Sequence, residues 1–176
     1  MSLQDRLKFE LIEPLQPFCE VEIFKQDSNA LVQDFVGQKR HIDIAFIDPP
    51  YNSRQYSRFY HLLETLAKND KPTLYGVARK PESELISAYC KSEAVFAFEK
   101  LVATLAKFTK ILLVTYNNTY TSKSSSSHNK ITLEQIAKIL ESVGKTHKYE
   151  FNFQAFSSGK TNFNNHKEMI FVCELG

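Results

Sequence analysis

Glycine is scarce in this chain of 176 residues, which contains five, and no two of them lie close enough to form a G-x-G turn. A Rossmann-like nucleotide-binding half normally opens with a strand and a Gly-rich loop, because a backbone without side chains can approach the ligand closely. No such loop occurs anywhere in the sequence, so the sequence excludes a complete Rossmann-like binding half within these residues.

Cysteine is also rare. Cys19, Cys90 and Cys173 lie far apart and form no C-x-x-C pair. This spacing argues against a zinc site and predicts reduced, mostly buried thiols in a cytoplasmic protein. The sequence also lacks an apolar run long enough to span a membrane and shows no signal peptide. The formal net charge of +2 is small, so any contact with nucleic acid must depend on where the charges lie.

The most informative segment is an apolar run at residues 42–47 followed by Asp48, Pro49, Pro50 and Tyr51. The run is typical of a strand in a parallel sheet. The two prolines end the strand, because neither donates a backbone hydrogen bond, and they fix φ. An acid, two carbonyl groups and an aromatic ring are therefore expected at the carboxyl end of a strand, where open α/β sheets bind ligands.

This tetrapeptide suits attack by a planar amino group. The Asp48 carboxylate can accept one amine hydrogen and a proline carbonyl the other, which frees the nitrogen lone pair for an electrophile. Tyr51 offers a flat face for a heterocycle extruded from a duplex. The simpler interpretation is a proline-rich turn in which the Asp48 side chain caps a neighbouring group.

The stretch HIDIAFIDPPYNSRQYSRFYHLLETLA, residues 41–67, resembles the catalytic segment of adenine-specific DNA methyltransferases of the Dam-like alpha class. The resemblance continues weakly through residues 111–118 and 163–171 and covers most of the chain from about residue 21 onward. It implies an α/β fold: a partial class I methyltransferase (Rossmann-like) sheet with flanking helices and without the N-terminal Gly-rich strands. We expect residues 1–20 to be an irregular lead-in and residues 21–176 to form one domain.

The resemblance also implies S-adenosylmethionine as the methyl donor and a flipped adenine of double-stranded DNA as the acceptor, in a restriction-modification setting. It assigns the catalytic role to Asp48, Pro49, Pro50 and Tyr51. It places Asp27, Ser28 and Asp48 at the cofactor, although Asp27 or Ser28 equally fits a helix N-cap. Candidate DNA contacts are Tyr51, Arg54, Arg58, Lys123 and Lys130, although surface basic residues are often only solvated.

Because the Gly-rich half precedes the catalytic strand in the alpha class, the chain is expected to be the C-terminal half of such an enzyme and inactive alone. The strand at residues 42–47 should then expose a sheet edge, which predicts a homodimer, a covering N-terminal segment, a second subunit or poor stability. Two alternative functions remain: methylation of an amino group in RNA, and a non-catalytic remnant that binds DNA or a partner chain.

Periodicity predicts the remaining elements. Helices are expected at residues 30–35, 58–68, 82–110 (one helix or two abutting) and 132–143, the last with a capping box at Thr132 and Gln135. Further strands are expected at residues 21–24, 111–116, 149–156 and 169–174, the last two paired with each other. Residues 69–81 and 121–130 are predicted loops, and Asn117 and Asn118 fit either a ligand cleft or a turn.

Overall fold

The fold is known from a computed structural model, which describes residues 18–77, 79–82, 86–118, 128–152 and 166–176. The helical elements are α1 (Ser28–Gly37), α2 (Tyr56–Phe59), α3 (His61–Lys68), the 3₁₀ turn η1 (Ala88–Cys90), α4 (Ala94–Leu105) and α5 (Leu133–Glu141). The strands are β1 (Ile42–Ile47), β2 (Leu74–Tyr75), β3 (Lys80–Pro81), β4 (Thr109–Asn117), β5 (Gly144–Asn152) and β6 (Lys167–Leu175).

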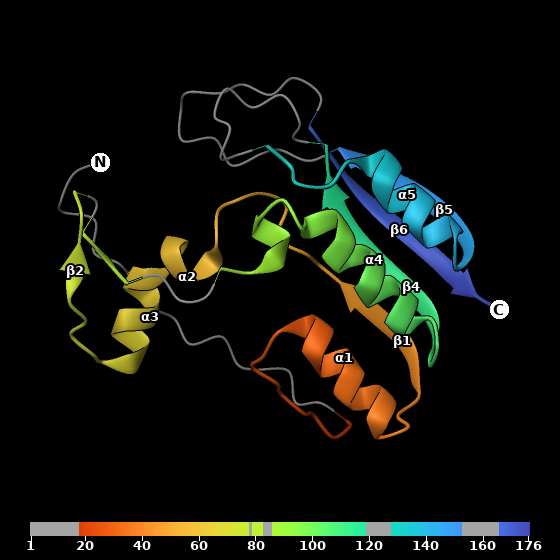
Figure 1. The fold of residues 1–176 in the computed structure, drawn as a ribbon, viewed down its shortest axis with the longest axis horizontal. Coiled ribbons are helices and arrows are strands. Elements are labelled where there is room, and N and C mark those ends of the chain that lie inside the picture. Colours follow the sequence, from red (N-terminus) through yellow and green to blue (C-terminus); the bar gives the residue numbers. More distant parts are fainter. Residues whose placement is uncertain (1–17, 78, 83–85, 119–127, 153–165) are drawn as a thin grey trace.

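The main sheet has four strands in the order β1-β4-β6-β5. β1 and β4 are parallel, with Ile44 opposite Ile111, whereas β6 runs antiparallel to both of its neighbours, β4 and β5. The helices α4 and α5 lie on one face of this sheet, and α1 packs beside α4 (Figure 1). This mixed α/β arrangement agrees with the predicted partial methyltransferase fold.

The hydrophobic core lies between the sheet and helices α4 and α5. Side chains from β4, β6 and both helices are fully buried there, because alternate residues of the strands and one stripe of each helix are apolar. The largest fully buried side chains are Tyr116, Phe98, Phe171, Leu112, Ile131, Ile136 and Leu140. This core fixes the ends of β4 and β6, and thereby the polar edge described below.

Among the residues that the structure describes, β1 lies at the edge of the sheet and pairs with β4 alone, as expected for an exposed edge. The strand is correspondingly less buried than its apolar sequence suggests, with Ile44 54% and Phe46 65% exposed. Its helix-facing residue Ile47 is buried and joins the core. β1 is therefore anchored on one side and open on the other.

Two helix starts follow their predicted capping chemistry. Asp27 is the N-cap of α1 and accepts a hydrogen bond from the Ala30 amide at 3.1 Å. Thr132 and Gln135 form the predicted capping box of α5: the Gln135 amide donates to Thr132 Oγ1 and the Thr132 amide donates to Gln135 Oε1. The predicted strands at residues 111–116 and 169–174 are also confirmed, as β4 and β6.

Several predicted elements are wrong. Residues 21–24 form no strand, and Val21 and Ile23 are exposed, because an alternating pattern needs a neighbouring strand to form a ladder. In the described part of residues 82–110, which leaves out residues 83–85, the predicted helix is instead η1 and α4, because Ser87 caps a short turn and β4 already begins at Thr109. The strand predicted at residues 149–156 is present as β5 and pairs with β6 as expected, but it starts at Gly144, five residues before its predicted start; residues 153–156 lie outside the described residues.

The segment after the catalytic loop also differs from prediction. The helix expected at residues 58–68 is divided into α2 and α3 at Tyr60, whose dihedral angles leave the helical region. The predicted loop at 69–81 contains the two-stranded ribbon of β2 and β3, with Gly76 at a positive φ in the turn. We call residues 56–81 the arm; Figure 1 shows it projecting away from the main sheet.

Two other expectations concern the burial of the cysteines and membrane-spanning helices. Of the three free cysteines, Cys90 and Cys173 are buried as predicted, whereas Cys19 is exposed. Within the described ranges, every helix is too short or too polar to cross a membrane.

Candidate functional site

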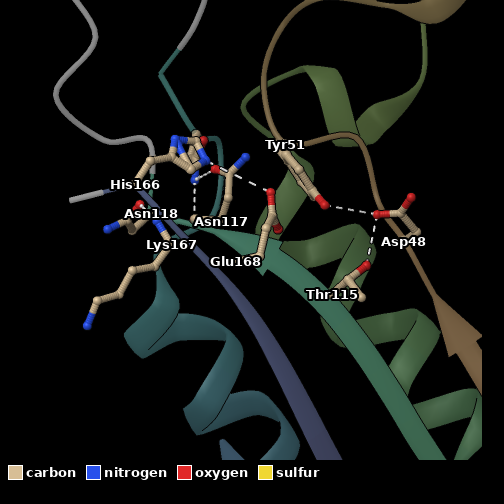
Figure 2. A network of polar contacts seen from close by, with 9 residues as sticks. Asp48, Tyr51, Thr115, Asn117, Asn118, His166, Lys167 and Glu168 are labelled. Atoms are coloured by element: carbon tan, nitrogen blue, oxygen red, sulfur yellow. Dashed lines mark hydrogen bonds and ion pairs between the residues drawn. The ribbon is translucent and has the colours of Figure 1, made fainter. Parts of the chain in front are cut away.

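The site forms at one edge of the main sheet, where the chain direction of each strand brings polar residues together. β1 and β4 are parallel, so Asp48, which follows β1, and Asn117, the last residue of β4, lie at the same edge. β6 runs the opposite way and begins at this edge, with Glu168 paired opposite Asn117. Figure 2 shows Thr115 of β4 and Glu168 of β6 beside Asp48 and Tyr51 of the loop that leaves β1.

Asp48 is fixed by two hydroxyl donors. Its Oδ1 atom accepts hydrogen bonds from Tyr51 Oη at 3.1 Å and from Thr115 Oγ1 at 2.9 Å, and both are drawn in Figure 2. Among the described residues, no hydrogen bond reaches Oδ2, and the Asp48 side chain is exposed. The carboxylate is thus oriented through one oxygen while the other is available to an external donor.

Tyr51 is the second fixed point of the loop. Its ring packs edge-on against Tyr116, with the centroids 4.8 Å apart. Its backbone carbonyl accepts hydrogen bonds from Tyr116 Oη at 3.1 Å and from the Lys130 amide at 2.8 Å. Burial, followed by the nearby Asp48 and Glu168 charges, raises the pKa of the Tyr51 phenol, so it remains a hydrogen-bond donor.

The loop separates two hollows. On one side lies a cavity of about 880 Å³, between α1, β1 and the segment around η1, to which Asp48, Pro49 and Pro50 contribute. On the other side lies a smaller hollow of about 150 Å³, lined by Pro50, Tyr51, Asn52, Arg54, Tyr56 and Tyr60. Pro50 borders both, so the Asp48–Tyr51 loop forms the wall between a large, mainly apolar cavity and a small aromatic one.

The structure brings the predicted cofactor residues together. Asp27, Ser28 and Asp48 line the same large cavity, although Asp27 and Asp48 are 21 positions apart in the sequence. Asp27 also serves as the N-cap of α1, so the two interpretations of this turn are compatible. Tyr89, which lines the cavity as well, donates a hydrogen bond to Asn29 at 2.8 Å and fixes the start of α1 against η1.

Of the basic residues predicted to contact DNA, only some lie at the site in the described part of the chain. Arg54 is exposed and lines the small hollow, and its amide donates to Asn52 Oδ1 at 2.9 Å. Lys130 is half-buried and joins the loop through its amide. Lys123 and the side chain of Arg58 lie outside the described residues.

Sequence reasoning missed the residues that support the loop from the neighbouring strands. Thr115 and Tyr116 precede the polar tip of β4, and only their place near the end of a buried strand hinted at a role. Asn117 and Asn118 brace the surrounding segments: Asn129 Nδ2 donates to Asn117 Oδ1 at 3.0 Å, and the Lys167 amide donates to Asn118 Oδ1 at 3.0 Å. Whether either residue also contributes to a ligand cleft stays a prediction.

Comparison with known proteins identifies the relatives of the chain. The profile of the D12 class N6 adenine-specific DNA methyltransferase family matches residues 23–117, more than half of the chain. Type II methyltransferase M.FokI of Planomicrobium okeanokoites is 39% identical over 128 residues, which cover 72% of this chain and 17% of the relative. Type II methyltransferase M.NlaIII of Neisseria lactamica is 34% identical over 147 residues, covering 83% and 39%, respectively.

A third relative, modification methylase StsI of Streptococcus sanguinis, is 43% identical over 97 residues, which cover 54% of this chain and 14% of the relative. The chain therefore spans less than half the length of each of these relatives. No solved structure matches the chain significantly.

Proposed function

Because the chain belongs to the D12 class N6 adenine-specific DNA methyltransferase family, we propose that it carries the catalytic loop of an enzyme that methylates the amino group of adenine in double-stranded DNA. The observation that carries this proposal is the position of the Asp48–Tyr51 loop between two hollows of different character. A methyl donor and an acceptor base must approach each other from opposite sides for an in-line displacement, and the loop lies where they would meet.

The residues of the loop have distinct roles in this proposal. Asp48 Oδ2 accepts one hydrogen of the adenine amine, and the Pro49 carbonyl accepts the other, so that the nitrogen lone pair is directed toward the large cavity. Thr115 and Tyr51 hold the Asp48 carboxylate in place from the opposite oxygen. The ring of Tyr51 forms a face of the small hollow, where the flipped adenine would stack.

The large cavity suits S-adenosylmethionine, which supplies an electrophilic methyl group on a sulfonium ion when bound. Val32, Ala45 and Phe46 give an apolar wall for the adenine ring of the cofactor. The carboxylates of Asp27 and Asp48 line the same cavity and would face the polar and cationic groups of the cofactor. The volume lies within the usual range of about 300–1,000 Å³ for small-molecule sites. Asp27 and Ser28 would contact the nucleoside, and Asp48 would lie at the reacting end.

DNA contacts are proposed for exposed residues around the small hollow. Arg54 borders it, and Lys130 adjoins the loop, so both can meet phosphates beside an extruded nucleotide. Arg58 and Lys123 remain candidates for the same role.

A further polypeptide segment is proposed to complete the site at β1. The outer edge of this strand has no partner among the described residues, and Ile44 and Phe46 are exposed beside the large cavity. A neighbouring strand with a Gly-rich turn, from the same enzyme or from a second subunit, would pair with the edge and close the cavity. Methyl transfer is then expected only when that segment is present.

The test is transfer of labelled methyl groups from S-adenosylmethionine to duplex DNA, by the chain alone and with a polypeptide that supplies the Gly-rich segment. N6-methyladenine identified by mass spectrometry is the expected product of the combined sample. Asp48→Ala should reduce the rate by about 100-fold or more, while the single-alanine change Glu141→Ala, on the exposed end of α5, should not. Methylated RNA but not DNA, or no transfer in the combined sample, would contradict the proposal.

A further inference from the structure

A second carboxylate at the loop, that of Glu168, has no role in the chemistry described above. Glu168 is paired opposite Asn117 across the β4–β6 ladder, and its side chain is 25% exposed. Figure 2 shows its carboxyl group extending toward Tyr51, whose hydroxyl donates to Asp48. Tyr51 thus lies between two acids, one in the loop after β1 and the other in β6.

No neighbouring cation in the described residues cancels the charge of Glu168. Lys167 projects to the other face of β6, where its Nζ atom lies 2.7 Å from Glu150. His166 Nε2 is 3.9 Å from Glu168 Oε1, but its side chain is only 8% exposed, and burial lowers its pKa. Burial thus favours the uncharged form of the imidazole, which leaves the negative charge of Glu168 without compensation from His166.

The titratable groups that face Glu168 in the described part of the chain are Asp48, Tyr51 and His166. Burial and then the Asp48 charge raise the pKa of Glu168, while a hydrogen bond with the Asn117 side chain opposes this rise. The geometry agrees: Glu168 lies opposite Asn117, which shares a face of β4 with Thr115, and Thr115 donates to Asp48, so the two acids lie at the same edge of the sheet. A pair of like charges at one loop is unfavourable unless a positive charge joins them.

Methyl transfer brings such a charge. The amine nitrogen forms a bond to the methyl carbon as the bond from that carbon to sulfur breaks, and the electron pair of the broken bond stays on sulfur. The nitrogen becomes cationic until it releases one proton to solvent. A carboxylate near the amine stabilises the transition state, in which the nitrogen is becoming positive, more than it stabilises the bound substrates, in which the nitrogen is neutral. Such a difference in stabilisation speeds up the reaction.

We propose that Glu168 is a positioning residue of the methyl transfer, whose ionised carboxylate strengthens the negative field at Asp48 and so stabilises the positive charge that arrives on the amine. This inference rests on the function proposed above. The alternative is that Glu168 and His166 only fasten the start of β6. Replacing Glu168 by glutamine keeps the hydrogen bond to Asn117 and would leave a purely structural role intact. The same replacement removes the negative charge and would abolish an electrostatic role.

The first test needs neither cofactor nor DNA. Carbon-13 NMR titration of the glutamate carboxyl carbons in this chain should give a lower pKa for Glu168 in Asp48→Asn than in the unchanged protein. The substitution preserves the shape of the Asp48 side chain and removes its charge. An unchanged Glu168 pKa would show that the two acids are not coupled and would overturn the inference, whether or not the protein methylates DNA.

The second test is single-turnover methyl transfer by the Glu168→Gln variant in the complemented enzyme, that is, the chain combined with the polypeptide that supplies the Gly-rich segment. We expect the rate at saturating substrates to fall about 10- to 30-fold, the effect of one charge at several ångströms in a partly buried site, with little change in KM. The loss of rate on acidification through the raised Glu168 pKa should disappear in this variant. Glu168→Asp, which keeps the charge, should recover part of the rate.

The matched control is Glu174→Gln, which removes the same charge from the exposed far end of β6 and should leave the rate unchanged. If the unchanged enzyme is active and Glu168→Gln matches it in rate and pH profile, the inference fails while the proposed function stands. If the unchanged enzyme makes no N6-methyladenine, the proposed function fails, and this inference fails with it.

Discussion

Helices α4 and α3 have the same kind of amphipathic sequence, but the apolar face of α4 is buried and that of α3 is exposed. In α4, the apolar stripe is buried against the sheet, and Phe98 and Val102 are inaccessible to solvent. In α3, the apolar residues Leu62, Leu63 and Leu66 are more than half exposed, and the helix has no buried residue. An amphipathic pattern thus indicates a helix and the face it will bury, but not whether the same chain supplies the surface that covers it.

The same contrast separates β4 from β1. Both strands are apolar and parallel, yet in the described part of the chain β4 is paired on both sides, whereas β1 is paired on one side and exposes Ile44 and Phe46. Phe46 of β1 lines the large cavity, whereas Tyr56 and Tyr60 of the arm line the small hollow beside the catalytic loop. This distribution supports the proposal that a further segment completes the protein there.

The largest expected difference is between substitutions in the two helices. Phe98→Ala should lower the free energy of unfolding by about 3–5 kcal/mol, because a fully buried ring is replaced by a cavity. Leu63→Ala should change it by less than about 0.5 kcal/mol, because the side chain is exposed. Urea denaturation followed by circular dichroism measures both, and equal losses would mean that α3 is packed in solution.

A second contrast concerns two glycines. A Cβ atom at Gly144 would lie 2.3 Å from the Glu174 carbonyl oxygen and 2.9 Å from Cys173 Sγ, so Gly144→Ala should cost about 1–3 kcal/mol by overpacking. Gly37→Ala meets no atom within 4 Å at the end of α1 and should be neutral or slightly stabilising. Thermal unfolding of the two variants provides the comparison, and a stable Gly144→Ala would show that the β5–β6 register differs.

A smaller effect is expected from the α5 capping box. Thr132→Ala removes the acceptor for the Gln135 amide and should cost about 1 kcal/mol. Thr73→Ala, at an exposed residue of the arm, serves as the control and should have little effect. A loss for Thr73→Ala as large as that for Thr132→Ala would contradict the view that stability resides in the sheet and its helices.

The smallest effect is electrostatic. Lys148 and Lys167 lower the pKa of Glu150 from 4.5 to about 2. A lowered folded-state pKa adds stability that is present above the unfolded value and is lost as the pH falls through the folded value. Glu150→Gln should therefore flatten the stability profile between about pH 4.5 and 2, with a small amplitude because the group is exposed. An unchanged acid profile would indicate that neither lysine pairs with Glu150 in solution.

The sequence predicted what depends on local chemistry. The apolar run ended by Pro49 and Pro50 located β1 and its loop, and the Thr132 and Gln135 pattern located the start of α5. The extent of the helix predicted at residues 82–110 was wrong, because the pairing of Thr109 with Ile42 across the sheet overrides local helical preference. Contacts between distant segments decide such boundaries.

The need for contacts between distant segments also explains which site residues the sequence did and did not predict. Asp48 and Tyr51 were predicted as site residues because they follow a recognisable strand end and match the catalytic segment that carries the family resemblance. Thr115 and Glu168 were not assigned roles, because they reach the loop only through the order and direction of β4 and β6. No local pattern marks either residue as part of a site.

The central claim is that the Asp48–Tyr51 loop separates a cofactor cavity from a base-binding hollow. Its most direct test is calorimetric binding of S-adenosylmethionine, alongside the fluorescence of duplex DNA with 2-aminopurine at the target position, in the complemented protein. Phe46→Ala, on the cavity side, should weaken cofactor binding and leave the fluorescence response intact, whereas Tyr51→Ala should do the reverse. If each substitution affects both measurements equally, or neither, the loop is not the wall between two sites.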